Sequence, residues 1–412
     1  MTLGTRLSPA ATAMAFDHYP VASLMNVTPR PRAVFTHGRG SWLWDSEGRA
    51  YLDLVQGWAV NTLGHAPPAI VAALAEQGSR LIHAGPGFYN DRAVELAQRL
   101  AQLSGLQRCF FTNSGAEANE GAIKLARKFG QIHRGGAFEI ITFEHGFHGR
   151  TLATMSASGK PGFDTLFAPQ VSGFPKARLD DIDSVLALVG RHTVAVLLEP
   201  IQGEAGVIEA GPGFLQDLRE LCDKRGLLLM FDEVQTGIAR TGELWGFEAS
   251  GVRPDVMTLG KGLGGGVPIG ALLAREEVCC FAHGDQGGTY NGNALVCAAA
   301  MVVLDAVTAP GFLDGVRLRS QQLRAGLDRI ARRIGSPPVR GRGLLLALDL
   351  PRANQAARLA DAVRERASPD GSRPGLLVNP VRPQRLRFVP ALNIAADEVD
   401  LALAILDEVL QA

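Results

Sequence analysis

An aspartate and a lysine stand at the ends of two predicted strands in the middle of the chain. Residues 227–231 form an apolar run that ends at Asp232, and residues 255–259 form a second run before Gly260 and Lys261. Open α/β sheets bind ligands beyond the carboxyl ends of their strands. A carboxylate buried there must be paired or hydrogen-bonded. A lysine in a dry pocket has a lowered pKa and can act as an amine nucleophile and then as a base.

Each of these two residues, taken alone, also has a structural explanation. Asp232 fits a structural ion pair. Lys261 precedes the glycine-rich run 262–266 and fits an exposed lysine in a flexible loop. The same run would let the backbone approach a ligand closely. The residues at the other strand ends decide between these alternatives.

Three further predicted strands, at 108–112, 138–143 and 193–198, are also followed by polar or ionisable residues. These following segments are 113–116, 144–150 and 199–204. A structural loop would need only turn residues there, whereas successive strand ends that deliver reactive groups predict an active site. The sequence therefore predicts an enzyme.

Within these segments, Ser114, Gly115 and Ala116 open a predicted helix whose free N–H groups and dipole could hold a phosphate. The alternative is a capping box, because Glu117 follows Ser114 by three residues. Phe147 lies in a loop at a strand end, where its ring could stack on a planar cofactor. Its alternative is an ordinary core position.

Near the C-terminus, Arg387 lies in a predicted strand whose alternation puts Leu386 and Phe388 on the opposite face. An arginine on a strand can bind a carboxylate in a bidentate fork, and the alternative is a solvated face. His145 and His148 have no partner at metal-ligand spacing, so no metal site is expected.

The elements that must position these groups alternate between strands and helices from residue 108 to residue 274. Unbroken apolar strands in such an alternation predict an α/β fold with a mainly parallel sheet flanked by helices. Residues 41–54 predict a hairpin, and beyond Asn293 helices and short strands follow in α+β order. We predict an N-terminal segment of a small domain (1–65), a large domain (66–308) and a C-terminal part of the small domain (309–412).

The composition limits the possible partners and compartment. The chain has 412 residues, 46% hydrophobic, and zero formal net charge, so neither nucleic acid nor an anionic membrane surface is an expected partner. The apolar runs are too short for a membrane span, and residues 1–25 lack the apolar core of a signal peptide. Five scattered cysteines without a CxxC motif predict a reducing cytoplasm and no zinc site.

Together these residues resemble the class III, subgroup II pyridoxal-phosphate aminotransferases, from about His18 to Leu410. Within the class, the chain is similar to the acetylornithine aminotransferases. The motifs that carry the resemblance are NSGAEANEGAIKLAR (113–127), FHGRT (147–151), LEPIQGEAGV (198–207), FDEVQTGIARTGELW (231–245), LGKGLGGGVPIGALL (259–273), GGTYNGN (287–293) and LRFVPALNI (386–394). The resemblance implies the type I fold of pyridoxal-phosphate-dependent transferases.

The resemblance also implies a role for each residue around the cofactor ring. Lys261 would carry pyridoxal 5'-phosphate covalently, and Asp232 would pair with the ring nitrogen. Gln235 would hydrogen-bond the ring hydroxyl, and Phe147 and Val234 would lie on the two faces of the ring.

The phosphate would be held by Ser114, Gly115 and Ala116. Thr289 would reach the same phosphate from the partner subunit, which implies a homodimer with shared active sites.

For the substrates, the resemblance assigns Arg387 to the α-carboxylate. Arg150 would take the distal carboxylate of 2-oxoglutarate or glutamate, with Glu204 nearby as a switchable partner. The loop 203–206 reads as in ornithine δ-aminotransferases. Against that, Gly57 stands where those enzymes carry a tyrosine, and a glycine leaves room for an N-acyl group.

The implied reaction is a ping-pong transfer of the δ-amino group of N2-acetyl-L-ornithine to 2-oxoglutarate. Its products are N-acetyl-L-glutamate 5-semialdehyde and L-glutamate, as in arginine biosynthesis. The alternative donors are ornithine, succinylornithine, N-succinyl-diaminopimelate and 4-aminobutyrate. A decarboxylase or aminomutase on the same fold, and a cofactor-binding regulator without turnover, are the other hypotheses.

Overall fold

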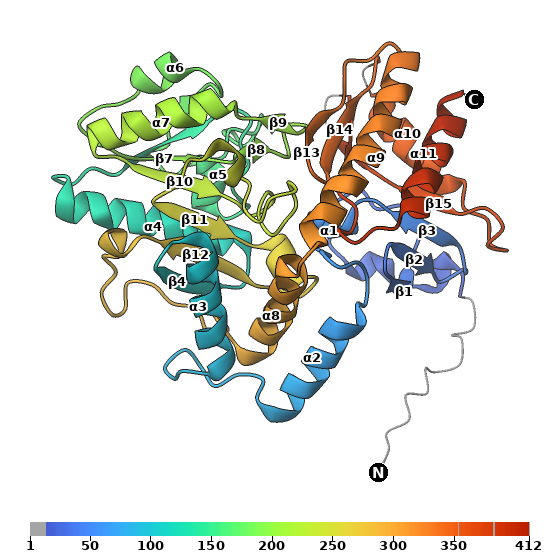
Figure 1. The fold of residues 1–412 in the computed structure, drawn as a ribbon, viewed down its shortest axis with the longest axis horizontal. Helices are drawn as coiled ribbons and strands as arrows, with labels where there is room; N and C mark the ends of the chain where they lie inside the picture. Colours follow the sequence, from blue (N-terminus) through green and yellow to red (C-terminus); the bar gives the residue numbers. More distant parts are fainter. Residues whose placement is uncertain (1–13, 353, 382–383, 412) are drawn as a thin grey trace.

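The computed structural model describes residues 14–352, 354–381 and 384–411. Residues 1–13, half of the stretch in which no signal peptide is expected, lie outside it. The centre of the fold is a seven-stranded sheet with the order β4-β12-β11-β10-β7-β5-β6 (Figure 1). Its strands are β4 (Arg108–Thr112), β5 (Glu139–Phe143), β6 (Lys176–Ala177), β7 (Thr193–Leu198), β10 (Leu228–Asp232), β11 (Val256–Leu259) and β12 (Gly270–Ala274).

The strands of this sheet are apolar on both faces because helices cover both faces. In β10, Leu229 and Phe231 belong to the larger core cluster, while Leu228 and Met230 belong to a second cluster on the other face. This is the alternation that a pleated strand imposes. All six residues of β7 are buried. The prediction of a mainly parallel sheet flanked by helices is confirmed.

One strand departs from the expected direction. β12 runs antiparallel to both of its neighbours, β11 and β4. A parallel return needs a crossover of roughly a dozen residues or more, and the loop 260–269 is too short for one. The reversal brings the start of β12 next to the end of β11, because Ala271 pairs with Leu259 and Gly270 pairs with Thr112.

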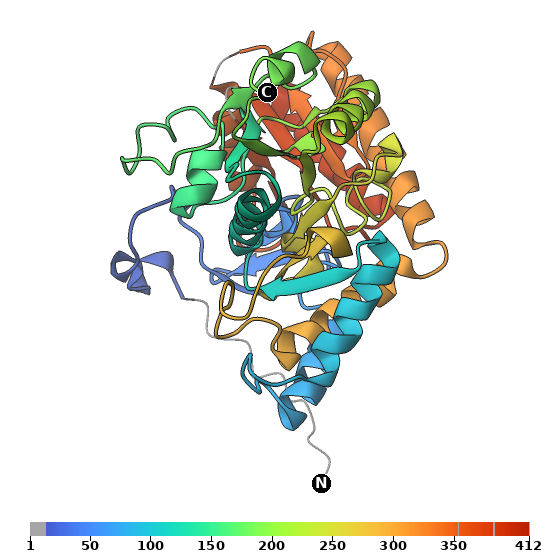
Figure 2. The same ribbon diagram turned by 90° about the vertical axis from the view of Figure 1, so that its left-hand side faces the viewer.

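Helix α4 covers one face of the sheet, and α3, α7 and α8 contribute to the core on the other (Figures 1 and 2). In the described part of the chain no single helix is long and apolar enough to cross a membrane, and the pair α8 and α9 passes that test only when joined across a 73° bend. The helices around the sheet are α2 (Pro68–Arg80), α3 (Asp91–Ser104), α4 (Gly115–His133), α5 (Leu152–Ala157), α6 (Ile182–Leu186), α7 (Pro212–Arg225) and α8 (Ala294–Thr308).

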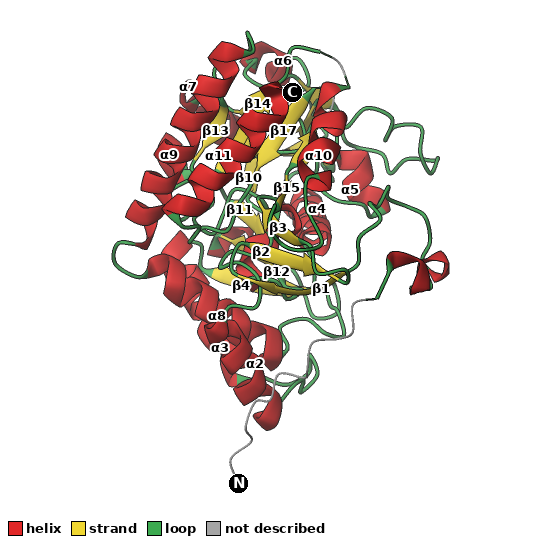
Figure 3. Cartoon of the chain, turned by 90° about the vertical axis from the view of Figure 1, so that its right-hand side faces the viewer, coloured by secondary structure: helices red, strands yellow, loops and turns green. Residues whose placement is uncertain are grey.

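Two smaller four-stranded sheets lie beside α9, α10 and α11 (Figure 3). The first, β1-β2-β3-β15, joins the predicted hairpin to a strand from the C-terminal region, and β1 was not predicted. The second has the order β13-β14-β17-β16. Their elements are β1 (Phe35–Arg39), β2 (Trp42–Asp45), β3 (Ala50–Asp53), β13 (Arg340–Arg342), β14 (Leu345–Asp349), β15 (Gly375–Leu377), β16 (Asn379–Val381), β17 (Arg385–Phe388), α9 (Phe312–Arg333), α10 (Gln355–Glu365) and α11 (Ala396–Gln411).

A segment after β3 connects these sheets to the lysine loop. It begins with α1 (Gln56–Ala59), a single left-handed turn in which all four residues have φ between 47° and 66°. Thr62 then donates a hydrogen bond of 2.7 Å to the carbonyl of Gly262. The backbone N–H of Leu392 donates to the carbonyl of Thr62 at 2.9 Å. Residues distant in sequence therefore fix the loop that follows Lys261.

Candidate active site

Lys261 begins a short 3-10 helix, η4 (Lys261–Gly264), directly after β11. Its backbone is left-handed, with φ of 39°, a conformation that costs a non-glycine residue roughly 1–2 kcal/mol. The side chain is half-buried. Burial lowers the pKa of the Lys261 ammonium, and the charge of Asp232 opposes that shift. A lysine with a lowered pKa at a strained position is suited to act as a nucleophile and base.

Asp232 is the last residue of β10 and is buried within a hydrogen-bond network. Its Oδ2 accepts from Asn119 Nδ2 at 2.7 Å and lies 2.8 Å from His148 Nδ1. Its Oδ1 accepts from the N–H of Val234 at 3.0 Å. Thr258 in turn donates to Asn119 Oδ1 at 2.7 Å. These hydrogen bonds fix the direction of the carboxylate.

Asn119 and His148 were not predicted as site residues. Asn119 lies on α4, four residues after Gly115, so it faces the same side of the helix. That spacing was the available signal. His148 was considered only as a metal ligand, although it follows a strand end. Its Nε2 is buried and without a hydrogen-bond partner among the described residues.

The start of α4 shows the helix cap that the sequence left as an alternative, while the phosphate site stays a prediction. Ser114 caps the helix, because its Oγ accepts from the N–H of Glu117 at 3.2 Å. Glu117 Oε2 accepts from the N–H of Asn113 at 2.6 Å. The Ser114 hydroxyl can still donate its hydrogen, and the first N–H groups of a helix have no partner within it. The cap is therefore compatible with an anion at this position.

The same helix start is closely packed against the strand ends. A Cβ on Gly115 would lie 2.6 Å from Val234 Cγ1, and a Cβ on Gly260 would lie 3.1 Å from the Gly115 Cα. Neither glycine can be replaced without moving the neighbouring chain. The two strand ends that carry Asp232 and Lys261 thus meet directly at the start of α4.

Phe147 lies above this region and is half-buried rather than a core residue. Its N–H donates to Glu199 Oε1 at 2.8 Å. Glu199 was not predicted individually and is buried close to Asp232. Burial raises the pKa of the Glu199 carboxyl to about 8, and the charge of Asp232 adds to the shift.

The raised pKa of Glu199 makes stability depend on pH. Between about 4.5, the ordinary value, and about 8, the folded chain binds more protons at this carboxyl than the unfolded chain does. The free energy of unfolding therefore falls as the pH rises through that interval. We expect Glu199→Gln, which keeps the Oε1 acceptor, to remove this part of the decline in urea denaturation. Curves of unfolding free energy against pH that run parallel for wild type and variant would contradict this expectation. Glu220→Gln, on the exposed face of α7, is the control.

Arg387 lies on β17 and is almost fully buried, so the solvated-face alternative is wrong. Its Nη2 forms an ion pair of 2.8 Å with Glu204 Oε1. Asn379 Oδ1 accepts from Nε at 3.0 Å and from Nη2 at 2.7 Å. Gln235 Oε1 accepts from Nη1 at 3.2 Å. The guanidinium is thus held in place by two neutral groups in addition to one carboxylate.

Glu204, expected as a switchable partner in this site, forms ion pairs with cations other than Arg150. In the described residues, Glu204 forms ion pairs with Arg387 and with Lys160, whose Nζ lies 3.6 Å from Oε2. Arg150 is exposed and lies over the Phe163 ring, with Cζ 6.0 Å from the ring centroid. No fixed spacing from Glu204 pointed to these partners, because both come from other segments of the chain.

The remaining predicted residues lie near this centre or on the surface. Gly57 is in the left-handed turn α1, which packs against η4. Thr289 is exposed in the loop before α8. That loop is tied to the strand end beside Ser114, because Asn113 Nδ2 donates to Asn291 Oδ1 at 2.8 Å.

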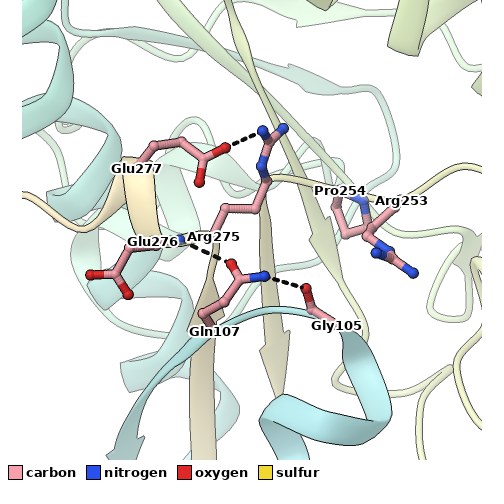
Figure 4. Close-up of a pocket in the computed structure, with 7 residues that line it drawn as sticks. All are labelled: Gly105, Gln107, Arg253, Pro254, Arg275, Glu276 and Glu277. Carbon is pink, nitrogen blue, oxygen red and sulfur yellow. Dashed lines mark hydrogen bonds and ion pairs between the residues drawn. The ribbon is translucent and has the colours of Figure 1, made fainter.

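A surface cavity of about 350 Å³ lies at the opposite edge of the sheet, near the first residue of β4 and the last residue of β12 (Figure 4). Gln107 bridges it by accepting from the N–H of Glu276 at 3.1 Å and donating to the carbonyl of Gly105 at 3.0 Å. Arg275 pairs with Glu277. Its charged side chains largely neutralise one another, and the cavity contains none of the predicted site residues.

The predicted site residues fit pyridoxal phosphate. A buried carboxylate, Asp232, is held by hydrogen bonds beside a lysine with a lowered pKa. A helix start able to hold an anion adjoins both. An aromatic ring, Phe147, lies at the neighbouring strand end, with its N–H anchored to Glu199.

Comparison with known proteins agrees with this site. The chain is 56% identical over 399 residues to "Acetylornithine aminotransferase 2" of Bordetella bronchiseptica, covering 97% of this chain and 99% of that protein. It is 54% identical to "Acetylornithine aminotransferase" of Ralstonia nicotianae, covering 97% and 100%.

Among solved structures, N-acetylornithine aminotransferase from Stenotrophomonas maltophilia has a TM-score of 0.80 at 38% identity, covering 94% of this chain and 98% of that one. Ornithine aminotransferase from Toxoplasma gondii has a TM-score of 0.86 at 31% identity, covering 95% and 93%. The family described as "Aminotransferase class-III" matches residues 24–410. With this match over most of its length, the chain belongs to the class III aminotransferases.

Proposed function

We propose that this aminotransferase moves the δ-amino group of N2-acetyl-L-ornithine to 2-oxoglutarate. The products are N-acetyl-L-glutamate 5-semialdehyde and L-glutamate, a step suited to arginine biosynthesis. The observation that carries the proposal is the identity of 54–56% over nearly the whole chain with proteins named acetylornithine aminotransferase.

Pyridoxal phosphate is the cofactor of this class, and when bound it supplies an electron sink for the substrate carbon that loses a proton. Lys261 would hold it covalently and, once released by the incoming amine, would take the proton from the δ-carbon. Asp232 would keep a proton on the ring nitrogen. Ser114, Gly115 and Ala116 would hold the phosphate.

The Arg387–Glu204 ion pair supports an ω-amine as the donor. The reacting carbon of such a donor carries no carboxylate, so an uncompensated arginine beside it would be an unpaired buried charge. With Glu204 in place, the charge of Arg387 is neutralised. When the keto acid enters, Arg387 would take its α-carboxylate, and Arg150 would take the distal carboxylate.

Around the ring, Phe147 and Val234 would lie on the two faces. Gln235, which accepts a hydrogen bond from Arg387, would also hydrogen-bond the ring hydroxyl. Gly57 would leave room for the acetyl group, since a tyrosine at this position would fill that space.

A panel of amine donors with 2-oxoglutarate tests the proposal. Glutamate formation should be fastest, by kcat/KM, with N2-acetyl-L-ornithine, and a missing acyl contact should lower the value for ornithine by roughly 10-fold or more. Succinylornithine, N-succinyl-diaminopimelate and 4-aminobutyrate complete the panel. Equal or higher kcat/KM for another donor would replace the proposed substrate, and turnover that does not depend on 2-oxoglutarate would point to a decarboxylase or aminomutase.

Ornithine itself is the second candidate. Two observations favour it: the loop 203–206, which reads as in ornithine δ-aminotransferases, and the TM-score of 0.86 to the Toxoplasma gondii ornithine aminotransferase. The glycine at position 57 favours the acylated donor.

We further propose a cytoplasmic homodimer in which Thr289 of each subunit reaches the phosphate of the other. The exposure of Thr289 supports this proposal, because a residue that serves a second subunit must lie on the surface of the first. Sedimentation equilibrium tests the dimer, and a monomer with full activity would contradict the shared site.

A further inference from the structure

Glu204 lies between two cations in this site, and each of its oxygens faces one of them. Oε1 is 2.8 Å from Arg387 Nη2, and Oε2 is 3.6 Å from Lys160 Nζ. The first distance is that of a charge-assisted hydrogen bond. The second distance is that of an ion pair and is too long for a hydrogen bond. The carboxylate is therefore fully engaged with Arg387 and only partly with Lys160.

The two cations differ in how firmly they are held. Arg387 has three hydrogen bonds to Asn379 and Gln235 and is almost fully buried, so its guanidinium stays in place if the carboxylate leaves. The Lys160 side chain is 36% exposed and lies over the rings of Phe147 and Phe163, at 5.5 and 5.6 Å from their centroids. Aromatic faces stabilise a cation without fixing its direction.

Glu204 itself can move while its backbone does not. It stands at the tip of a short hairpin between β8 (Ile201–Gln202) and β9 (Ile208–Glu209). Arg385 fixes this tip by donating to the carbonyl of Ala205 at 2.7 Å. A carboxylate in this position can change partners by rotation of its own side chain, which is fast.

The charge of Glu204 must be compensated wherever the carboxylate lies. Burial opposes the charged form, but Arg387, Lys261 and Lys160 together hold the pKa of Glu204 below its ordinary value. A half-buried carboxylate that loses its partner is stabilised by a second cation within reach. Lys160 is the second cation already in ion-pair contact with it. Among the described residues Glu204 forms no ion pair with Arg150, whose Cζ lies 6.0 Å from the Phe163 ring centroid.

The resemblance to the class already implies that Glu204 is a switchable partner in this site. We propose that Lys160 is the residue that receives it: when the α-carboxylate of the keto acid binds Arg387, the ion pair of Glu204 passes to Lys160. No bond is made or broken in this exchange. Lys160 is thus a positioning residue for the dicarboxylate half-reaction. This inference rests on the proposed function, since it requires one substrate that needs Arg387 and one that does not.

The test compares Lys160→Met and Lys160→Arg in the holoenzyme. Loss of a partly exposed ion pair should raise the KM for 2-oxoglutarate, and the inhibition constant of glutarate, by about fivefold in Lys160→Met. The KM for the amine donor should change by less than about half that factor. Lys160→Arg keeps the charge and should restore both acceptor constants. Lys224→Met, on the exposed surface of α7, is the matched control.

A double-mutant cycle separates this role from a structural one. In a Glu204→Gln background no carboxylate is present to exchange between Arg387 and Lys160. Adding Lys160→Met should therefore leave the KM for 2-oxoglutarate unchanged. The proposal is overturned if the effect of Lys160→Met persists in that background, or if donor and acceptor constants rise equally. Failure of the wild type to form glutamate would instead refute the proposed function.

Discussion

Lys261→Ala should lower kcat by about 10⁴-fold or more, because one substitution removes both the nucleophile and the base. The effect should appear in both half-reactions, since each needs a proton moved at the reacting carbon. The measurement is single-turnover kinetics with donor and with 2-oxoglutarate. Covalent attachment is measured separately, by borohydride reduction followed by peptide mass spectrometry, and only the peptide with Lys261 should carry the cofactor mass.

Lys224→Ala is the control for this substitution, because its side chain is 74% exposed on α7 and belongs to no site. It should retain wild-type turnover and attachment. A Lys261→Ala variant that still turned over and still carried the cofactor covalently would show that another amine does the chemistry.

Asp232→Asn should lower kcat/KM by roughly 10²–10³-fold, because the neutral amide cannot hold a proton on a ring nitrogen as a carboxylate does. The amide is close in shape but has only one oxygen, which can accept either from Asn119 or from the N–H of Val234, so the fold should persist with one hydrogen bond fewer in this network. The readouts are kcat/KM for both substrates and the Tm.

Asp217→Asn is the matched control, since Asp217 is exposed on α7. Unchanged kcat/KM in Asp232→Asn would show that Asp232 serves only the network with His148. A large fall in Tm with proportionate loss of activity would assign it a structural role.

The fold was predictable wherever local pattern and tertiary context agree. β4 and β7 begin and end at the predicted residues because each is a clear apolar run, and α4 begins where the capping serine predicts. The direction of β12 was not predicted, since an apolar run does not reveal its direction. The length of the preceding loop decides the strand direction, and loop 260–269 is short enough to have indicated an antiparallel β12.

The candidate site was predictable for residues that follow strands, such as Asp232 and Lys261. It was not predictable for residues whose role depends on a partner from a distant segment. Lys160 belongs to the site because it forms an ion pair with Glu204, and Asn119 belongs to it because it donates a hydrogen bond to Asp232. The ion pairs of Glu204 with Arg387 and Lys160 likewise join distant segments.

The pairing of β3 with β15 has a consequence for how the chain folds during synthesis. Tyr51 pairs with Gly375, and Asp53 pairs with Leu377. At roughly 5–20 residues per second, β3 leaves the ribosome long before its partner has been translated. Until then one edge of the β1–β3 sheet is open, and an open edge is a template for pairing with other chains. Expression at a slower translation rate should therefore lengthen the period in which the nascent chain needs a chaperone.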